Sequence, residues 1–495
     1  MSLIQISHLT FGYDGSYDTI FDDVSLQLDT NWKLGFTGRN GRGKTTFLKL
    51  LLGQYEYRGS ITASVVFDYF PFEVEQKQQN TIEILETLAP ECAYWQIKKE
   101  LSLLEMEEDA LWRPFCQLSN GEQTKILLAV LFLRENHFLL IDEPTNHLDV
   151  VGRKTVSQYL KNKRGFILVS HDRQFLDDVV DHILSINKRS ITVQKGNFSS
   201  WQANKEKQDV FELREHEKRK REIQSLEVAA KTTASWSDKI EKTKVGYQDS
   251  SGNKPDRGYI GHKAAKMMRR CKSIENRIET AIAEKQNLLK DIEKQQSLKL
   301  SCLSYHKEVL LECKEVSLFY GKKQIFQPVS FSVKRGERVA LQGRNGTGKS
   351  SLLKWLAGED IPLTGQIQKG SRLKISYVCQ NTSGLEKTLK EYAQKEDISY
   401  SLFLAILRKL GFEREQFDKK IEHFSEGQKK KVLLAKSLCQ KAHIYIWDEP
   451  LNFIDVLSRI QIEELLLEYQ PTMLFVEHDM VFTKKIATKF VKLKS

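Results

Sequence analysis

A glycine-rich sequence of the form G-x-x-x-x-G-K-[ST] occurs twice in the chain, and this repeat limits the possible folds more than any other feature. The two copies lie at residues 38–45 and 343–350. The glycines allow backbone N–H groups to surround phosphate oxygens, and a lysine and a hydroxyl group complete the loop. Because such a loop lies between a buried strand and the first turn of a helix, two copies predict two phosphate-binding domains of the α/β class.

The repeat extends well beyond the glycine loops. Lys44 and Lys349 lie 305 positions apart, and Asp142 and Asp448 are separated by 306. Short apolar runs that are typical of buried parallel strands occur in both halves. These runs are 33–37, 138–141 and 166–169 in the first half, and 338–342, 444–447 and 473–476 in the second. We therefore predict two tandem P-loop nucleotide-binding domains with mainly parallel sheets, at residues 1–200 and 301–495.

The segment between the repeats, residues 201–300, has a different composition. Lys, Glu, Arg and Gln dominate it, and apolar residues recur every three or four positions, which predicts long helices. A stretch rich in Gly, Ser and Pro interrupts the pattern, so we predict a helical hairpin that joins the two domains.

Charge is concentrated at the predicted hairpin tip, residues 239–272. This stretch holds ten basic and three acidic side chains, a net of +7 in a chain whose total is +11. A solvated loop is one explanation, but the concentration of like charge favours a nucleic-acid partner. The predicted RNA-contact residues are Lys239, Lys242, Lys244, Lys254, Arg257, Lys263, Lys266, Arg269 and Arg270.

Composition excludes several classes of protein. No apolar run approaches the roughly 20 residues of a membrane span, and the first residues do not resemble a secretion signal. The seven cysteines are scattered and never form C-x-x-C, which favours reduced thiols over metal binding. We expect a cytoplasmic protein that does not cross a membrane.

An acidic pair ends one apolar run in each half, Asp142-Glu143 and Asp448-Glu449. Nucleotides bind at the carboxyl ends of such strands, and phosphoryl transfer needs cradled phosphates, Mg²⁺ and a group that orients water. We predict ATP and Mg²⁺ as cofactors, with Glu143 and Glu449 catalytic. The predicted metal ligands are Thr45, Asp142, Ser350 and Asp448. The predicted phosphate-binding residues are Gly38, Asn40, Gly41, Gly43, Lys44, Thr45, Thr46, Gly343, Asn345, Gly346, Gly348, Lys349, Ser350 and Ser351.

The sequences LSNGEQ at 118–123 and FSEGQ at 424–428 resemble the signature of the ATP-binding cassette family, and the resemblance covers the whole chain. It implies two ABC-type ATPase domains paired head to tail, in which each signature caps the nucleotide held by the other domain. The signature residues concerned are Ser119, Gly121, Ser425 and Gly427.

The same resemblance implies further roles. It implies His171 and His478 as catalytic γ-phosphate sensors, Asp149 and Asp455 as interdomain loop residues, Gln380 as a nucleotide and metal contact, and Tyr13 and Tyr320 as adenine stackers. For the tyrosines, an ordinary strand aromatic is nearly as good an explanation. Phe72 stands where the first domain should carry the glutamine that matches Gln380, so the two sites need not hydrolyse ATP equally.

Two cassettes joined by a charged hairpin resemble the ABC-F group, and segments 29–35, 111–115, 169–172 and 445–452 are similar to Lsa-type antibiotic-resistance proteins. The resemblance implies a ribosome-associated monomer whose ATP-bound form enters the tRNA exit site of the 70S ribosome. There the tip would pass the P-site tRNA toward 23S rRNA of the peptidyl transferase centre and displace lincosamides, pleuromutilins and group A streptogramins, and hydrolysis would release the protein. A housekeeping ABC-F translation factor and the ATPase module of a drug exporter are the alternatives.

Overall fold

The computed structural model describes residues 2–13, 19–134, 136–146, 148–186, 190–242, 261–262, 265–270, 272–274, 276–277, 280, 298–320, 323–344, 346–412 and 414–494. The chain divides into two compact units, one made of Met1–Trp201 with Gln295–Ser495 and the other of Gln202–Lys294. Both glycine loops therefore lie in the same unit. The predicted domain boundaries near residues 200 and 300 stay a prediction.

Each repeat is built on a central sheet, and the predicted α/β class is confirmed. In the first repeat the strand order is β5 (Val66–Phe70), β6 (His137–Asp142), β7 (Phe166–Val169), β3 (Lys33–Thr37), β8 (His182–Ile186) and β9 (Ile191–Lys195). All neighbours are parallel except β8 and β9. In the second repeat the order is β15 (Ile375–Val378), β16 (Ile444–Asp448), β17 (Met473–Val476), β13 (Arg338–Gln342) and β18 (Lys489–Lys492), all parallel.

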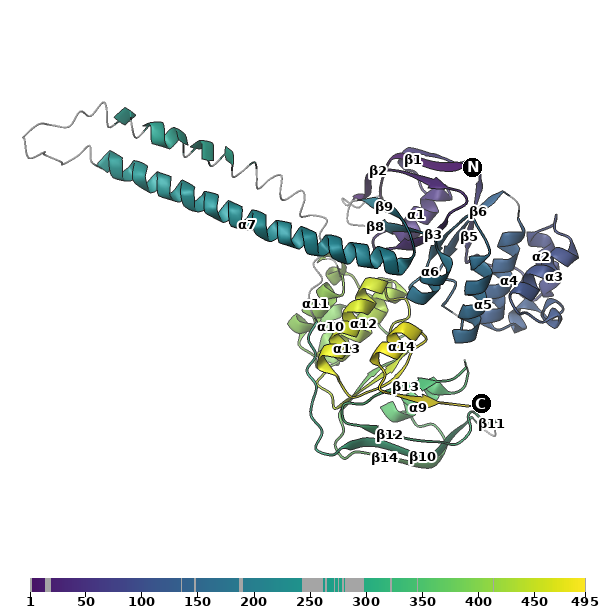
Figure 1. The fold of residues 1–495 in the computed structure, drawn as a ribbon. Helices are drawn as coiled ribbons and strands as arrows, with labels where there is room; N and C mark the ends of the chain where they lie inside the picture. The colour runs from purple at the N-terminus through teal and green to yellow at the C-terminus, as the bar shows by residue number, and fades with distance from the viewer. Residues whose placement is uncertain are drawn as a thin grey trace, which may run out of the picture. The chain divides into compact units, whose positions relative to one another are not determined.

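Helices cover one face of each sheet (Figure 1). In the first repeat these are α2 (Thr81–Leu88), α3 (Tyr94–Leu103), α4 (Asn120–Leu133), α5 (Val150–Lys161) and α6 (Arg173–Val179). In the second repeat they are α10 (Leu389–Lys395), α11 (Tyr400–Lys409), α12 (Glu426–Cys439), α13 (Val456–Tyr469) and α14 (Met480–Ile486). Alternate strand residues face opposite layers: Leu139 and Ile141 pack under these helices, whereas Phe138 and Leu140 face the other way.

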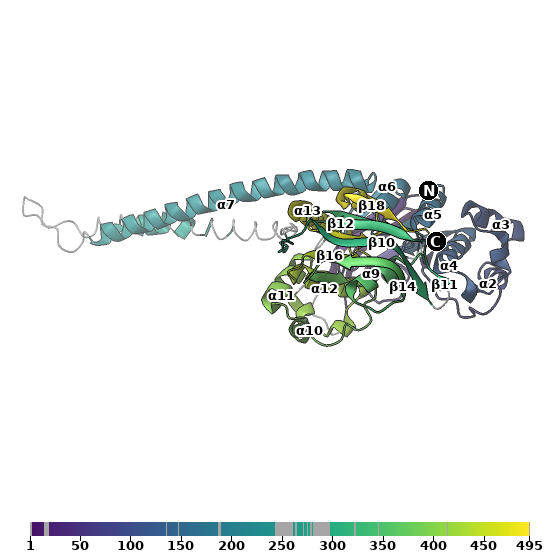
Figure 2. The same cartoon turned by 90° about the horizontal axis from the view of Figure 1, so that it is seen from below.

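The opposite face of each sheet holds the helix that follows the glycine loop, which the sequence predicted, and a small antiparallel sheet, which it did not. In the first repeat, α1 (Lys44–Leu51) packs with β2 (Thr19–Asp29), β1 (Leu3–Gly12) and β4 (Arg58–Thr62). In the second, α9 (Lys349–Ala357) packs with β10 (Val309–Tyr320), β12 (Val329–Lys334) and β14 (Leu363–Lys369), and β11 (Lys323–Gln324) pairs with β10 (Figure 2).

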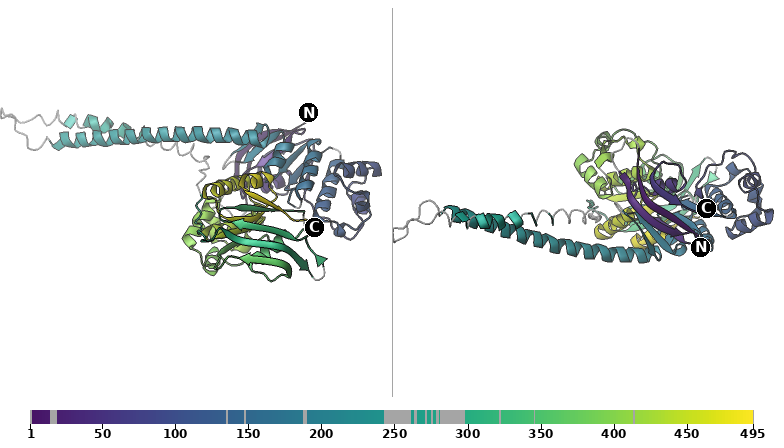
Figure 3. Two further views of the ribbon diagram at one scale, coloured as in Figure 1. Left: turned by 60° about the horizontal axis from the view of Figure 1, so that its bottom comes forward. Right: turned by 90° about the horizontal axis from the view of Figure 1, so that it is seen from above.

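The segment after the first repeat begins with α7 (Phe198–Lys242), a single helix of 45 residues (Figure 3). At a rise of about 1.5 Å per residue its length is about 68 Å. Phe198 and Trp201 at its start are buried in the core of the first repeat. This helix corresponds to the first predicted arm, whereas most of the second arm and of the tip lies outside the described residues.

The predicted RNA contacts fall into three groups. Lys244, Lys254, Arg257 and Lys263 lie outside the described residues, and Lys239 and Lys242 belong to α7 but their side chains are not described. Lys266, Arg269 and Arg270 are exposed. In the part of the chain that the structure describes, no helix has the length and apolar character needed to cross a membrane.

Candidate nucleotide-binding sites

Each glycine loop connects a central strand to a helix, β3 to α1 and β13 to α9. Gly43 and Gly348, the last residues before these helices, have φ of 89° and 77°, a left-handed conformation that favours glycine. A Cβ atom at Gly43 would lie 2.7 Å from Ile20 Cγ2, and one at Gly348 would lie 2.5 Å from Ile325 Cγ2. Glycine is thus required at both positions, both by the backbone conformation and by the close neighbour. Below, site one is the site around the first loop and site two is the site around the second.

The loop lysines are buried and lie inside their own loops. Lys44 Nζ donates to the carbonyl oxygens of Gly38 at 2.7 Å and Arg39 at 3.2 Å. Lys349 Nζ donates to those of Gly343 at 2.9 Å and Arg344 at 2.8 Å. Burial lowers the pKa of both lysines, although nearby carboxylates oppose the shift. Both ammonium groups are therefore held where a phosphate would lie over the loop.

The strand-end aspartates lie beside the loop hydroxyls, as the sequence analysis predicts for a metal site. Thr45 Oγ1 donates to Asp142 Oδ2 at 3.1 Å, and Ser350 Oγ donates to Asp448 Oδ1 at 3.0 Å. Burial raises the pKa of Asp142, and it raises that of Asp448 to about 6. Tyr69 Oη also donates to Asp142 Oδ2 at 3.1 Å.

The aspartate and the hydroxyl group at each site are suited to bind Mg²⁺. Asp448 Oδ2 is buried and has no hydrogen-bond partner within the described part of the chain, so it is free to bind a cation. Among the described residues, no three His, Cys, Asp or Glu side chains form a metal-binding group. Mg²⁺ is commonly held by one or two carboxylates together with the phosphates of the nucleotide, which matches this arrangement of one aspartate and one hydroxyl.

The two predicted catalytic glutamates have different surroundings. Glu449 Oε2 accepts hydrogen bonds from Gln380 Nε2 and Asn452 Nδ2, both at 2.7 Å, and its Oε1 lies 3.0 Å from His478 Nε2. Burial by itself raises the pKa of Glu449, but the His478 contact and the Gln380 hydrogen bond outweigh burial and lower it to about 2. Glu449 is thus held as an ionised carboxylate that can orient water.

Glu143 in site one is held less firmly. Its Oε1 lies 3.4 Å from His171 Nε2. Burial, with a contribution from the charge of Asp142, raises the pKa of Glu143 to about 8, and burial lowers the pKa of His171 well below its usual value. Glu143 and Glu449 share a left-handed backbone, with φ of 52° and 47°, so the difference lies in the side-chain partners.

The difference between Gln380 and Phe72 contributes to this asymmetry. Gln380 follows β15 and contacts Glu449, whereas Phe72 follows β5 at the equivalent place. Phe72 is half-buried and packs against the apolar core beneath the helices. Site one therefore has an apolar ring where site two has a hydrogen-bond donor. A contact of Gln380 with the metal or the nucleotide stays a prediction.

The first signature faces site two. Ser119 caps α4 by accepting a hydrogen bond from the Glu122 backbone N–H at 3.3 Å. A pocket of about 1090 Å³ is lined by residues of both repeats, among them Ser119, Gly121, Gly346, Lys349, Ser350, Ser351, Gln380, Glu449 and His478. The signature of one repeat and the glycine loop of the other thus share one cavity.

The second signature lies against site one. Ser425 caps α12 by accepting from the Gln428 backbone N–H at 3.4 Å. A Cβ atom at Gly427 would lie 2.6 Å from Asn40 Nδ2 and 2.4 Å from the carbonyl oxygen of Phe453. Asn40 Nδ2 itself donates to that oxygen at 2.7 Å. The two repeats are therefore arranged head to tail, and at site one the Asn40 side chain of the first repeat contacts the backbone of the second.

The remaining predicted site residues are placed as follows. Tyr13 Oη lies 2.8 Å from Thr46 Oγ1, at the first turn of α1, and the Tyr13 ring is 43% exposed. The side chain of Tyr320 and all of Asn345 lie outside the described residues. Asp149 and Asp455 cap α5 and α13 by accepting backbone N–H groups at 2.8 and 2.9 Å. Adenine stacking by the tyrosines stays a prediction.

Sequence reasoning missed two functional neighbours, Tyr69 and Asn452. Asn452 lies three residues after Glu449, and Tyr69 lies at the end of β5, opposite Leu140 of β6. A tyrosine stands at the same place in both strand ends, Tyr69 and Tyr377, three positions before Phe72 and Gln380. This shared tyrosine was a signal that sequence reasoning could have used.

Two glycine loops, each with a strand-end Asp-Glu pair and the signature of the other repeat beside it, define a paired P-loop ATPase. A family model described as "ABC transporter" matches residues 21–146 and 326–452. The chain belongs to this ATP-binding cassette family, in its ABC-F group, and is an ABC-type ATPase that binds ATP.

Individual relatives extend the match along the chain. The ribosome protection protein VmlR of Bacillus subtilis is 32% identical, over 96% of this chain and 84% of its own length. The ABC transporter F family member 2 of Arabidopsis thaliana is 24% identical, over 99% of this chain and 76% of its own length. Among solved structures, the archaeal ribosome recycling factor aABCE1 in complex with the stalk protein aP1 matches with a TM-score of 0.62 at 18% identity, covering 99% of this chain and 87% of that one. At that identity the structural match shows the fold alone.

Proposed function

We propose that this chain is a ribosome-binding ABC-F ATPase that protects the bacterial ribosome from antibiotics of the peptidyl transferase centre, namely lincosamides, pleuromutilins and group A streptogramins. The observation that carries the proposal is the similarity to a ribosome protection protein over 96% of the chain. Two complete Asp-Glu pairs support a protein that hydrolyses ATP as part of its cycle.

In this proposal ATP and Mg²⁺ bind at both glycine loops, and the γ-phosphate joins each loop to the signature of the other repeat. Lys349 and Ser350 hold one side of site two, and Ser119 and Gly121 close it from the other. The helix that begins after Ser119 offers free backbone N–H groups to the phosphate. Closure therefore depends on ATP, and hydrolysis with Glu449 as the base removes the group that holds the domains together.

The ATP-bound form would enter the tRNA exit site as a monomer, beside the P-site tRNA. The segment 239–272 would approach 23S rRNA, and its net charge of +7 favours such a partner. Within its described part, Lys266, Arg269 and Arg270 are exposed and Met268 is 58% exposed among them. Basic groups around an exposed flexible apolar side chain suit contact with both phosphates and bases.

The proposal is tested by preventing hydrolysis without preventing ATP binding. Glu143→Gln with Glu449→Gln keeps the shape of both side chains but removes the carboxylates, so the closed form should persist. We expect the double variant to sediment with purified 70S ribosomes in ATP but not in ADP, whereas the unaltered chain should dissociate. Release of the double variant at the same rate as the unaltered chain would contradict the proposed cycle.

A further inference from the structure

The contact between the two repeats differs between the sides that flank site one and site two. The repeat offset matches each residue of one side with a residue of the other. Helix α6 follows His171 as α14 follows His478, so Arg173 corresponds to Met480. Helix α13 follows Asp455 as α5 follows Asp149, so Glu463 corresponds to Ser157. A symmetric pair of ATPase domains would make the same contacts on both sides.

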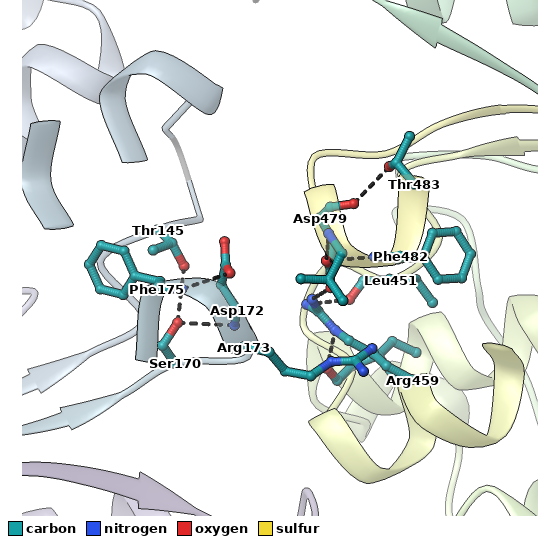
Figure 4. Close-up of polar contacts among 12 residues, drawn as sticks. Thr145, Ser170, Asp172, Arg173, Phe175, Leu451, Arg459, Asp479, Phe482 and Thr483 are labelled. Atoms are coloured by element: carbon teal, nitrogen blue, oxygen red, sulfur yellow. Dashed lines mark hydrogen bonds and ion pairs between the residues drawn. The ribbon is translucent and has the colours of Figure 1, made fainter. Parts of the chain in front are cut away.

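On the side of site one, an ion pair joins the repeats. Arg173, at the start of α6, extends from the first repeat toward the α13 helix of the second, which also carries Arg459 (Figure 4). Its Nη1 donates to Glu463 Oε2 at 3.4 Å, and its Nη2 donates to Glu463 Oε1. Glu463 is fully buried and also accepts from Lys485 Nζ at 3.1 Å. Removing the cation would leave a buried carboxylate with less compensation, which is costly.

Apolar packing accompanies this ion pair. Val456 lies seven positions before Glu463 and Ile460 lies three positions before it, on the same face of α13. Both residues belong to the hydrophobic core of the first repeat. Their exposed fractions are 3% and 9%. The hydrogen bond from Asn40 Nδ2 to the Phe453 carbonyl lies on the same side. One face of α13 is thus embedded in the first repeat.

Within the described residues, the equivalent face of α5 lacks the ion pair and the apolar packing. Val150, which corresponds to Val456, is 43% exposed, and the position of Ile460 is taken by the exposed Lys154. Ser157 and Met480 carry no charge, so they cannot form an ion pair. Both line a pocket of about 250 Å³ that is enclosed by α5, α6 and α14, beside the larger cavity of site two.

We propose that Arg173 and Glu463 are positioning residues that keep site one assembled throughout the ATPase cycle, so that the domains open and close at site two about this buried contact. Nucleotide at site one then exchanges slowly, because release requires the α6–α13 contact to separate. Nucleotide at site two exchanges with each opening. The inference concerns the ATPase alone and does not depend on the ribosomal role.

The experiment compares the release of a fluorescent ATP analogue from each site of the full chain, with Mg²⁺ and without ribosomes. Lys349→Ala confines binding to site one, and Lys44→Ala confines it to site two. We expect release from site one to be at least about ten times slower than release from site two, as expected if about 1.4 kcal/mol of contact must be broken. Equal release rates would overturn the proposal.

Variants that exchange the two sides assign the effect to the named residues. Arg173→Met with Glu463→Ser copies the side of site two and should bring site-one release to within about twofold of site two, whereas Arg173→Lys, which keeps the charge, should stay slow. The reverse exchange, Met480→Arg with Ser157→Glu, removes no existing ion pair and should slow site-two release at least fivefold. Folding of each variant is checked by circular dichroism.

The reverse exchange keeps the proposal falsifiable if the first variant does not fold. Unchanged site-two release from a folded Met480→Arg, Ser157→Glu chain would contradict the role of the ion pair. A general loss of packing would accelerate release from both sites, whereas loss of the positioning contact should accelerate release from site one only. Failure of this test leaves ribosome binding of the double Glu→Gln variant untouched, so the two proposals can fail separately.

Discussion

Site two should supply most of the ATP turnover, because more neighbouring side chains donate hydrogen bonds to the Glu449 carboxylate than to that of Glu143. Glu449 accepts from two amides at 2.7 Å and lies 3.0 Å from His478 Nε2, whereas the nearest imidazole nitrogen to Glu143 is 3.4 Å away. A hydrogen bond to a charged group contributes about 1.5–3 kcal/mol. If one such bond fixes the base in the transition state, the sites differ by about 10- to 150-fold in turnover.

Two single substitutions, Glu449→Gln and Glu143→Gln, separate the turnover of the two sites. We expect the first to lower kcat at least about tenfold and the second to leave most of the activity, since loss of a general base costs about 10²–10⁴-fold at the affected site alone. Phosphate release is measured at saturating ATP and Mg²⁺, and Glu464→Gln, at an exposed position of α13, is the control. Equal losses from the two catalytic substitutions would contradict the unequal turnover expected of the two sites.

Three further predictions concern single features of the chain. Gln380→Phe copies the Phe72 side chain and removes a donor to Glu449, so site-two turnover should fall about tenfold in phosphate-release assays, and unchanged turnover would be a contradiction. Glu477 is buried with a pKa raised by burial from 4.5 to about 8, so the folded chain holds a proton that the unfolded chain loses. Stability should therefore fall as pH rises from about 5 to 8. Glu477→Gln should reduce the change of the apparent Tm with pH over that range, whereas the exposed Glu464→Gln should leave it as it is. Changing Lys266, Arg269 and Arg270 to Gln should weaken ribosome binding and reduce its logarithmic salt slope by about 2–3, and an unchanged slope would exclude RNA contact by these residues.

The central sheets were predictable from the sequence because buried parallel strands are continuous apolar runs. The runs at 33–37, 166–169 and 473–476 coincide with β3, β7 and β17. Asp142 and Asp448 were also predictable, because each ends a strand whose partners bring it beside the glycine loop. In these places the local pattern and the fold demand the same residues.

The antiparallel sheets were harder to predict, since their strands have interrupted alternation. β1 and β2 pair with register shifts between Ile6 and Leu9 and again near Phe11, which disturbs the twofold period on which a sequence prediction depends.

The difference between the contacts that join the repeats beside site one and beside site two could not be predicted from the sequence. Arg173 and Glu463 are 290 positions apart, and no local pattern connects them. Only the position of α13 against the first repeat shows that the Glu463 carboxylate, which an isolated helix would expose, is a buried partner of Arg173.

Protection of translation is the most direct test of the proposed function. Purified bacterial ribosomes translate a reporter in a membrane-free system inhibited by lincomycin or tiamulin, and the purified chain is added with ATP. We expect synthesis to be restored by the unaltered chain and not by the Lys44→Ala, Lys349→Ala double variant. No restoration by a chain whose ATPase activity is intact would contradict ribosome protection and favour a housekeeping translation factor or an exporter ATPase.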